Sequence, residues 1–292
     1  AETGVTRLCY AGSTLQSSPQ SAISGRAPIQ LGAELFGSDT VEADGEIITL
    51  MLSLFKSCEV TRELTLDIGH IGIYDALFSD AGLDPDLESE IFDALQRKSM
   101  PDIDRLAASL PPEVATKLLA LAELHGSVSV VAEAKGIFAN EPVVLEALGE
   151  LESTLGLVQS EFPDVGVYVD LTELRGFRYH TGLVFAVYLE GRGSAVAKGG
   201  RYDNIGAVFG RDRPATGFAI DLKALIDDAA PAKPALPPVI APVSDDPLLR
   251  DAVATLRASG RTVVVDLESG ATALDGQRLV LKDGEWVIEM ES

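Results

Sequence analysis

The chain has 292 residues, of which 46% are hydrophobic and 23% are charged. This composition is typical of a globular protein with a sizeable core, and it excludes disordered, fibrous and collagen-like chains. The 23 basic and 45 acidic side chains give a formal net charge of −22, which argues against a long nucleic acid as partner because such binding needs basic groups that displace counterions.

The two cysteines, Cys9 and Cys58, provide neither a disulfide framework nor a metal-type spacing, which fits a reducing cytoplasm. No apolar run approaches the roughly 20 residues that a bilayer crossing needs, and the first residues have no secretory signal pattern. We therefore expect a cytoplasmic protein without a membrane partner. Because an alternating pattern starts almost at once, we also expect the chain to lack an upstream portion of its parent.

The N-terminal part of the chain is predicted to form a β-hairpin followed by a helix. Apolar side chains alternate over residues 5–16 and 28–37, and the serine-containing segment between them favours a long loop. From Asp39 the apolar residues follow a helical period, with Ser38 or Asp39 as the N-cap. Residues 64–68 alternate again and indicate a third strand.

The middle of the chain is predicted to be helical and then to return to strands. Residues 71–160 lack strand patterns and indicate a run of short helices punctuated by glycines and prolines. Such a block between strands is typical of an insertion on a sheet. Strand patterns return at residues 165–171, 176–190, 193–199 and 214–220, and the last of these leads into a short helix.

A proline-rich stretch at 229–238, with four prolines in ten residues, is predicted to be an extended linker. It separates a core at 1–228 from a small α/β unit at 239–292. In that unit the patterns indicate a strand at 239–241, a helix at 245–259 and a strand at 262–266. A hairpin around 282–284 closes the unit.

Generic catalytic and metal-binding signatures are mostly absent. The three histidines, His70, His125 and His180, have no spacing typical of metal ligands, so we expect no metal and no cofactor. The glycine-rich run Lys198–Asp203 lacks both the P-loop ending and the dinucleotide-binding spacing. We therefore expect no catalytic residues from these patterns.

The segment 170–221 is the most informative for function. Arg175 and Tyr179 are four residues apart, so on a strand they would share one face while His180 points to the other. A guanidinium beside a phenol suits a small molecule with a carboxylate and a polar ring. Gly182 and the pair Gly199-Gly200 would let such a ligand approach the sheet closely. An equally good interpretation of these residues is purely structural, with Arg175 paired to one of the many acidic side chains and the glycines forming β-bulges.

These residues also carry a family resemblance. The run Leu174-Arg-Gly-Phe-Arg-Tyr-His-Thr-Gly-Leu-Val-Phe185, followed by Gly199-Gly-Arg-Tyr-Asp203, resembles the histidine-binding motif of histidyl-tRNA synthetases. The runs that begin at Arg7 and at Ile29 resemble the motif 2 hairpin of the same class II family. The resemblance spans residues 5–225. It implies an α+β fold with an antiparallel sheet of class II synthetase type flanked by helices, with a helical insertion and a small C-terminal α/β unit.

The chain departs from that family where the ATP phosphates would bind. Gln16 stands in place of the arginine that holds the α-phosphate, and Ser17 and Ser18 replace the charged pair beyond it. The last motif ends with Ala224 where the family has a second arginine, which clamps the γ-phosphate. Since phosphoryl chemistry depends on such charge stabilisation, we expect adenylate formation to be lost. Arg178 and His180 also differ from the family pattern.

What remains is the amino-acid end of the site. By resemblance, a histidine-binding pocket would be lined by five residues, namely Gln30, Glu34, Arg175, Tyr179 and His180. It would be shaped by Gly182, Gly199, Gly200 and Tyr202. An intact amino-acid end with a lost ATP site is similar to the family of ATP phosphoribosyltransferase regulatory subunits.

That resemblance implies a non-catalytic protein of histidine biosynthesis. Its partners would be the short-form catalytic subunit of ATP phosphoribosyltransferase, histidine as a ligand, and a second copy in a homodimer within a hetero-oligomer. Two alternatives stay open. A synthetase-like enzyme with residual amino-acid activation would need the missing arginines, and a tRNA-binding module would need a basic face.

Overall fold

The computed structural model describes most of the chain. The described residues are 4–15, 27–79, 81–174, 179–206, 210, 212–226, 228–229, 236–267 and 277–290. The chain divides into two compact units, Ala1–Ala230 and Pro231–Ser292, and the predicted linker at 229–238 lies largely outside the described residues. None of the helices in the described ranges has the length and apolar character that a bilayer crossing requires.

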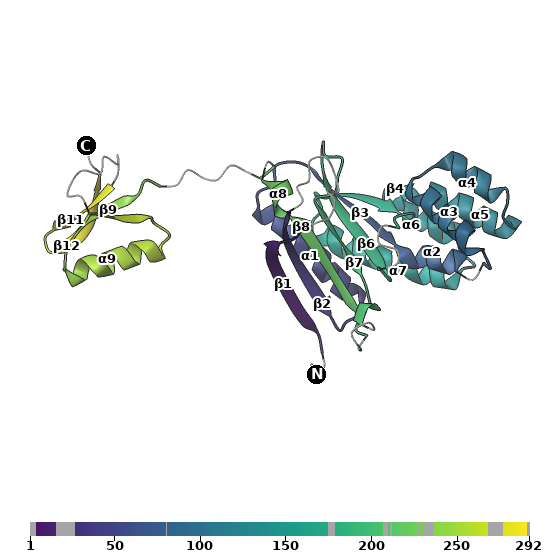
Figure 1. Ribbon diagram of the computed structural model, residues 1–292, viewed down its shortest axis with the longest axis horizontal. Coiled ribbons are helices and arrows are strands. Elements are labelled where there is room, and N and C mark those ends of the chain that lie inside the picture. The colour runs from purple at the N-terminus through teal and green to yellow at the C-terminus, as the bar shows by residue number, and fades with distance from the viewer. Residues whose placement is uncertain are drawn as a thin grey trace. The chain divides into compact units, whose positions relative to one another are not determined.

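An eight-stranded sheet forms the frame of the first unit, in the order β1-β2-β8-β7-β6-β3-β5-β4 (Figure 1). The strands are Thr6–Ser13 (β1), Ile29–Phe36 (β2), Leu64–His70 (β3), His125–Gly126 (β4), Gly166–Asp170 (β5), Leu183–Leu189 (β6), Ala197–Arg201 (β7) and Ala215–Asp221 (β8). Neighbours are antiparallel except for the parallel pair β3 and β5. The predicted antiparallel sheet is therefore confirmed, with one parallel pairing.

One face of this sheet is covered by helices. Helix α1 (Val41–Ser57) packs against β2 and β8, and it contacts α7 (Pro142–Glu161). Ala33 and Leu35 of β2 are buried in this core because alternate residues of a strand point to the same face. Thr40, rather than the expected Ser38 or Asp39, is the N-cap of α1, and its side chain makes no capping hydrogen bond.

The helical insertion is confirmed as well. Besides α7 it contains α2 (Ile71–Phe78), α3 (Pro85–Gln96), α4 (Met100–Ala107), α5 (Pro112–Glu123) and α6 (Ser129–Ile137). A proline lies in the first turn of α3, α4, α5 and α7, where its missing N–H costs no helical hydrogen bond. The short strand β4, which pairs with β5 at the sheet edge, was not predicted.

The strand predicted at 176–190 is shorter than expected. Strand β6 begins at Leu183, and Tyr179 and His180 lie in the turn before it. The turn is held because the Thr181 amide donates to the Arg201 carbonyl at 2.8 Å, which replaces a regular ladder. The prediction that Tyr179 and His180 project from opposite faces of one strand is therefore wrong.

The second unit is a small α/β fold, as predicted. Its elements are β9 (Val239–Pro242), α9 (Pro247–Ala258), β10 (Val263–Asp266), β11 (Gln277–Lys282) and β12 (Glu285–Met290), with the sheet order β10-β9-β11-β12. The strands β10, β9 and β11 are parallel, and β12 returns antiparallel after a turn in which Asp283 and Gly284 both have positive φ. Asp246 caps α9 by accepting from the Leu248 amide at 2.9 Å.

Candidate ligand-binding site

Polar side chains gather on the face of the first sheet opposite to α1. Gln30 and Glu34 alternate with the core residues of β2, so both point to this open face. Tyr10 of β1 lies opposite Gly32 in the register of the hairpin and shares their face. The Gln30 side-chain amide donates to the Tyr10 hydroxyl at 2.9 Å.

Glu34 is the acid of this group and is half-buried. The Tyr202 hydroxyl donates to its Oε2. Burial raises the pKa of Glu34, while the hydrogen bonds from Tyr202 and Tyr10 lower it in part. Burial, followed by the hydrogen bond to Glu34 and its charge, raises the pKa of Tyr202. Tyr202 therefore acts as a neutral donor to this carboxyl group.

A third tyrosine completes the group, which we call the tyrosine–glutamate cluster (Tyr10, Gln30, Glu34, Tyr179 and Tyr202). The rings of Tyr179 and Tyr202 lie 5.0 Å apart with an interplanar angle of 30°. Tyr179 is 46% exposed, whereas Tyr202 is 6% exposed. An exposed ring beside a half-buried carboxyl group suits a small planar ligand that offers N–H donors or a positive charge.

His180 lies next to the cluster but is held by the protein itself. Its ring meets that of Tyr179 edge-on at 5.1 Å, and its Nδ1 lies 3.2 Å from the Arg201 carbonyl oxygen. Because a carbonyl only accepts, this nitrogen carries the proton. Burial lowers the pKa of His180. The structure thus brings His180 to the edge of the predicted pocket as a neutral donor to the backbone.

The glycines make room for the protein's own side chains. A Cβ built on Gly217 would lie 1.7 Å from Glu34 Oε2, and one on Gly32 would lie 2.4 Å from the Tyr10 hydroxyl. On Gly200 it would lie 2.7 Å from His180 Nδ1. We expected the glycines to leave space for a ligand, and the structure instead fills that space with the residues that form the site.

Two of the predicted glycines lie away from the open face. A Cβ on Gly199 would meet the ring of the core residue Phe185 at 2.5 Å, because Gly199 faces the helices. Gly182 packs against the buried side chain of Arg201. Sequence reasoning also missed Tyr10, whose place opposite Gly32 is set by the strand register of the hairpin.

A buried ionic network supports the cluster from below. Arg201 Nε donates to Asp44 Oδ2 at 3.0 Å, and its two terminal nitrogens donate to the carbonyls of Ser38 and Thr40 at 3.1 and 3.2 Å. Asp203 accepts from the Thr181 hydroxyl at 2.9 Å and from the Ala215 amide at 3.0 Å. Tyr202 lies between these two anchored residues, so its hydroxyl is fixed toward Glu34.

Several predicted positions lie outside the described residues, namely Gln16, Ser17, Ser18, Arg175 and Arg178. The second clamp position is described, and Ala224 lies in the short helix α8 (Leu222–Leu225). Asp221 caps this helix by accepting from the Lys223 amide at 3.1 Å. The Lys223 ammonium donates to the Ala27 carbonyl at 2.6 Å. This lysine is therefore bonded to the backbone just before β2.

One group of carboxylates has a metal-like arrangement. Ligand oxygens of Asp67, Asp170 and Glu173 lie within 4.8 Å of one another. Asp170 is paired with the Lys98 ammonium at 2.6 Å and accepts from the amide and hydroxyl of Thr172. These contacts give Asp170 a structural role.

Comparisons with known proteins agree with this architecture. The family model described as histidyl-tRNA synthetase matches residues 1–225. The crystal structure of an ATP phosphoribosyltransferase regulatory subunit/histidyl-tRNA synthetase from Bacillus halodurans is similar with a TM-score of 0.73 and 27% identity, over 92% of this chain and 70% of that one. The fold and the open face thus define a protein of the class II, histidyl-tRNA synthetase-like type.

A narrower assignment follows from the remaining matches. The model described as the ATP phosphoribosyltransferase subunit HisZ C-terminal domain matches residues 237–289. The ATP phosphoribosyltransferase regulatory subunit of Thioalkalivibrio sulfidiphilus is 45% identical over 97% of this chain and 74% of its own length. The chain belongs to the ATP phosphoribosyltransferase regulatory subunit family, and the family resemblance found in the sequence is confirmed.

A protein in the ATP phosphoribosyl transferase (HisG:HisZ) complex from Thermotoga maritima has the same fold. Its TM-score is 0.60 at 21% identity, over 76% of this chain and 75% of that one.

Proposed function

We propose that this chain is a non-catalytic regulatory subunit that binds the short-form catalytic subunit of ATP phosphoribosyltransferase and raises its activity. The reaction is the first step of histidine biosynthesis, in which ATP and phosphoribosyl pyrophosphate condense. The family assignment supports this role, as does the HisG:HisZ complex of the Thermotoga maritima neighbour. The same role places the chain in the cytoplasm, within a hetero-oligomer that contains a homodimer of this subunit.

The observation that carries the proposal is the contrast between two parts of one sheet. The tyrosine–glutamate cluster is assembled, with Tyr202 donating to Glu34. At the end of β8, Asp221 and Ala224 occupy the motif that would clamp phosphates, and the neighbouring Lys223 is bonded to Ala27. Such a site would bind an amino acid but would not stabilise the charge of a transferring phosphate.

Histidine is the ligand that we assign to the tyrosine–glutamate cluster. Its imidazole N–H would donate to Glu34, and its ring would lie against the exposed ring of Tyr179. Arg175 would receive the carboxylate, as the family resemblance implies. A ligand regulates the assembly only if it binds the active and inactive arrangements with different affinity. Histidine bound to this chain would therefore change the activity of the complex.

The direct test measures phosphoribosyl transfer by the catalytic subunit with and without this chain. We expect higher turnover with the chain present and co-elution as an assembly larger than either protein. Added histidine should change the turnover of that assembly. Equal turnover in both samples, together with separate elution, would remove the proposed role.

The alternative of residual amino-acid activation has its own assay. Histidine-dependent exchange of pyrophosphate into ATP reports adenylate formation. We expect no exchange above a blank, because the phosphate clamps are lost. Exchange by the wild-type chain that disappears in Arg175→Ala would show that the chain is an amino-acid-activating enzyme.

A further inference from the structure

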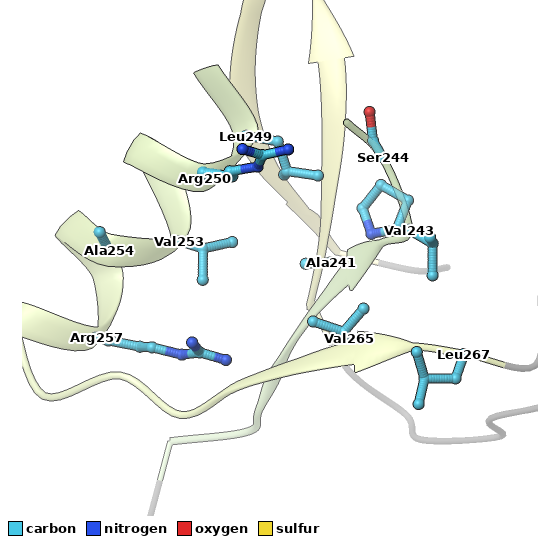
Figure 2. A pocket seen from close by; sticks show the side chains of 11 residues that line it. Ala241, Val243, Ser244, Leu249, Arg250, Val253, Ala254, Arg257, Val265 and Leu267 are labelled. Carbon is cyan, nitrogen blue, oxygen red and sulfur yellow. The ribbon is translucent and has the colours of Figure 1, made fainter. Parts of the chain in front are cut away.

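The second unit contains a groove between α9 and the strands β9 and β10 (Figure 2). Its volume is about 360 Å³. Figure 2 shows Val253 on the helix and Val265 on β10 facing this space, with Leu267 at the end of the strand. Val265 and Leu267 are 40% and 80% exposed. The floor of the groove is thus apolar and open to solvent.

Two arginines of α9 border the groove. Arg250 and Arg257 are seven residues apart and lie on one side of the helix (Figure 2). Arg257 donates to the Val263 carbonyl at 3.1 Å, which places it at the start of β10. The side chain of Arg250 is 68% exposed and lies 3.7 Å from Asp245. Among the 11 described residues that line the groove, none is acidic.

This charge is opposite to that of the chain as a whole. The formal net charge is −22, yet the groove presents two guanidinium groups over an apolar floor. Guanidinium groups recognise carboxylates through paired hydrogen bonds. The groove is therefore complementary to a ligand that combines carboxylates with an apolar side chain.

Strand β10 adds a second, independent feature. It is an edge strand of the four-stranded sheet, and in the described part of the chain it pairs with β9 alone. Its sequence, Val263-Val-Val-Asp266, has neither the lysine nor the proline that commonly protects a free edge. The outward-facing backbone groups are those of Val263 and Val265, and apart from the Val263 carbonyl, which accepts from Arg257, they are a template for a further strand. A small anion would not use this edge, whereas a peptide would.

We propose that this groove binds an extended, acidic segment of another protein, which adds as a strand to β10. Arg250 and Arg257 are about 10 Å apart along the helix axis, at about 1.5 Å per residue. Residues four apart on a strand are separated by about 13 Å and face the same side. The segment therefore carries two carboxylates at positions i and i+4, with an apolar residue between them over Val265. This inference does not depend on the proposed enzyme partner.

The test uses the whole chain and the capped, fluorescein-labelled peptide Thr-Glu-Thr-Val-Thr-Glu-Thr. Fluorescence anisotropy measures its affinity, and amide hydrogen exchange measures protection of Val263 and Val265, whose N–H groups point away from β9 in the parallel ladder. We expect saturable binding with slower exchange at these amides. The double variant Arg250→Glu/Arg257→Glu should bind at least tenfold more weakly, while Lys282→Glu in the same unit should change affinity less than twofold. A peptide with its two glutamates adjacent should also bind at least tenfold more weakly.

Several outcomes would overturn the proposal. They are absence of saturable binding to the wild-type chain, binding without protection of β10, and equal displacement by millimolar acetate or phosphate, which would indicate a small-anion site. A concentration-dependent dimer that dissociates in the double variant would assign the groove to a second copy instead. Arg250→Gln/Arg257→Gln repeats the comparison if charge reversal unfolds the unit, and unchanged affinity in that variant would also overturn it.

Discussion

At the scale of single residues, Glu34 is the group whose environment is most finely balanced. Burial favours its neutral form, whereas the hydroxyls of Tyr202 and Tyr10 favour the carboxylate. The net result is a raised pKa. A ligand with N–H donors would stabilise the carboxylate further. The charged form of Glu34 is therefore more stable in the filled site than in the free protein.

Replacing Glu34 by glutamine tests this balance. A raised pKa means that the folded state binds the proton more tightly than the unfolded state, so ionisation above that pKa costs stability, and the cost is absent below the ordinary pKa. Glu34→Gln should therefore stabilise the chain at pH 7 and lose that advantage as the pH falls toward 4. Urea unfolding at several pH values measures the difference in unfolding free energy between the variant and the wild type.

Glu46 is the matched control of opposite sign. The hydrogen bond from Arg7 holds its pKa below the usual range. Glu46→Gln should lose stability at pH 7 by up to about 1 kcal/mol, as is usual for exposed pairs, and this loss should vanish in acid. If Glu34→Gln is also less stable than the wild type at pH 7, our account of Glu34 is wrong.

The Tyr202 hydroxyl gives a second prediction at this scale. Tyr202→Phe keeps the ring beside Tyr179 but removes the donor to Glu34. A hydrogen bond to a charged group contributes about 1.5–3 kcal/mol, so histidine binding should weaken by roughly tenfold or more. Calorimetric titration with histidine measures the affinity. Tyr168→Phe on β5, which loses a hydroxyl hydrogen-bonded to His125 of β4, should leave the histidine affinity unchanged, and equal losses in the two variants would contradict the assignment.

At the scale of elements, the site depends on how β7 and α1 are joined. Arg201 links the end of β7 to the first turn of α1 through Asp44 and two carbonyl groups. Burial raises the pKa of Asp44, and the charge of Arg201 opposes that shift. Both side chains are at most 6% exposed, so neither can exchange its partner for water.

Arg201→Met should therefore be strongly destabilising. Removing one partner of a buried pair typically costs about 3–5 kcal/mol because the other charge is left uncompensated. Denaturant unfolding should show this loss, and Arg201→Met/Asp44→Leu should recover part of it. Arg105→Met removes only exposed contacts with Glu90 and Asp102 and should cost under about 1 kcal/mol. A double variant less stable than Arg201→Met would argue against the pairing.

Strand β8 offers a test of the site with little change elsewhere. A Cβ on Gly217 would displace the Glu34 carboxylate and press on the Ala33 carbonyl. Because a ligand that binds only the folded state stabilises it, we expect histidine to raise the melting temperature of the wild-type chain, and Gly217→Ala should abolish this rise. Gly149→Ala in α7 meets no atom within 4 Å and should stabilise the helix by about 0.5–1 kcal/mol while keeping the histidine response. A normal response in Gly217→Ala would exclude Glu34 from the site.

The elements that the sequence predicts best are those whose structure is decided by a local period. The alternation in β1 and β2 and the run of short helices punctuated by glycines and prolines could be predicted because each residue's neighbours in the chain fix its environment. The predicted start of β6 was wrong because the hydrogen bond from the Thr181 amide to the Arg201 carbonyl holds a turn before Leu183. The roles of Gly199 and Tyr10 were missed for the same reason, since strand register sets what faces them.

At the scale of the whole molecule, the charge of −22 is the dominant feature. Like charges repel one another in a compact chain, and this repulsion weakens as salt shortens the Debye length from about 30 Å at 0.01 M to about 8 Å at 0.15 M. The melting temperature should therefore rise by a few degrees between these salt concentrations. Sodium and potassium chloride should act alike, and a flat or falling curve would show that attractive ion pairs outweigh the repulsion.

The parallel pairing of β3 with β5 has a consequence for how the chain folds. These strands are neighbours in the sheet, yet the helices α2 to α7 lie between them in the sequence. Closing so long a loop has an entropic cost, and contacts of high sequence separation slow folding. Helices form in microseconds from local contacts. We therefore expect the insertion to become helical early and the sheet to close late, with the pairing of β2 and β8, whose residues lie still farther apart in the sequence, forming after that of β3 and β5.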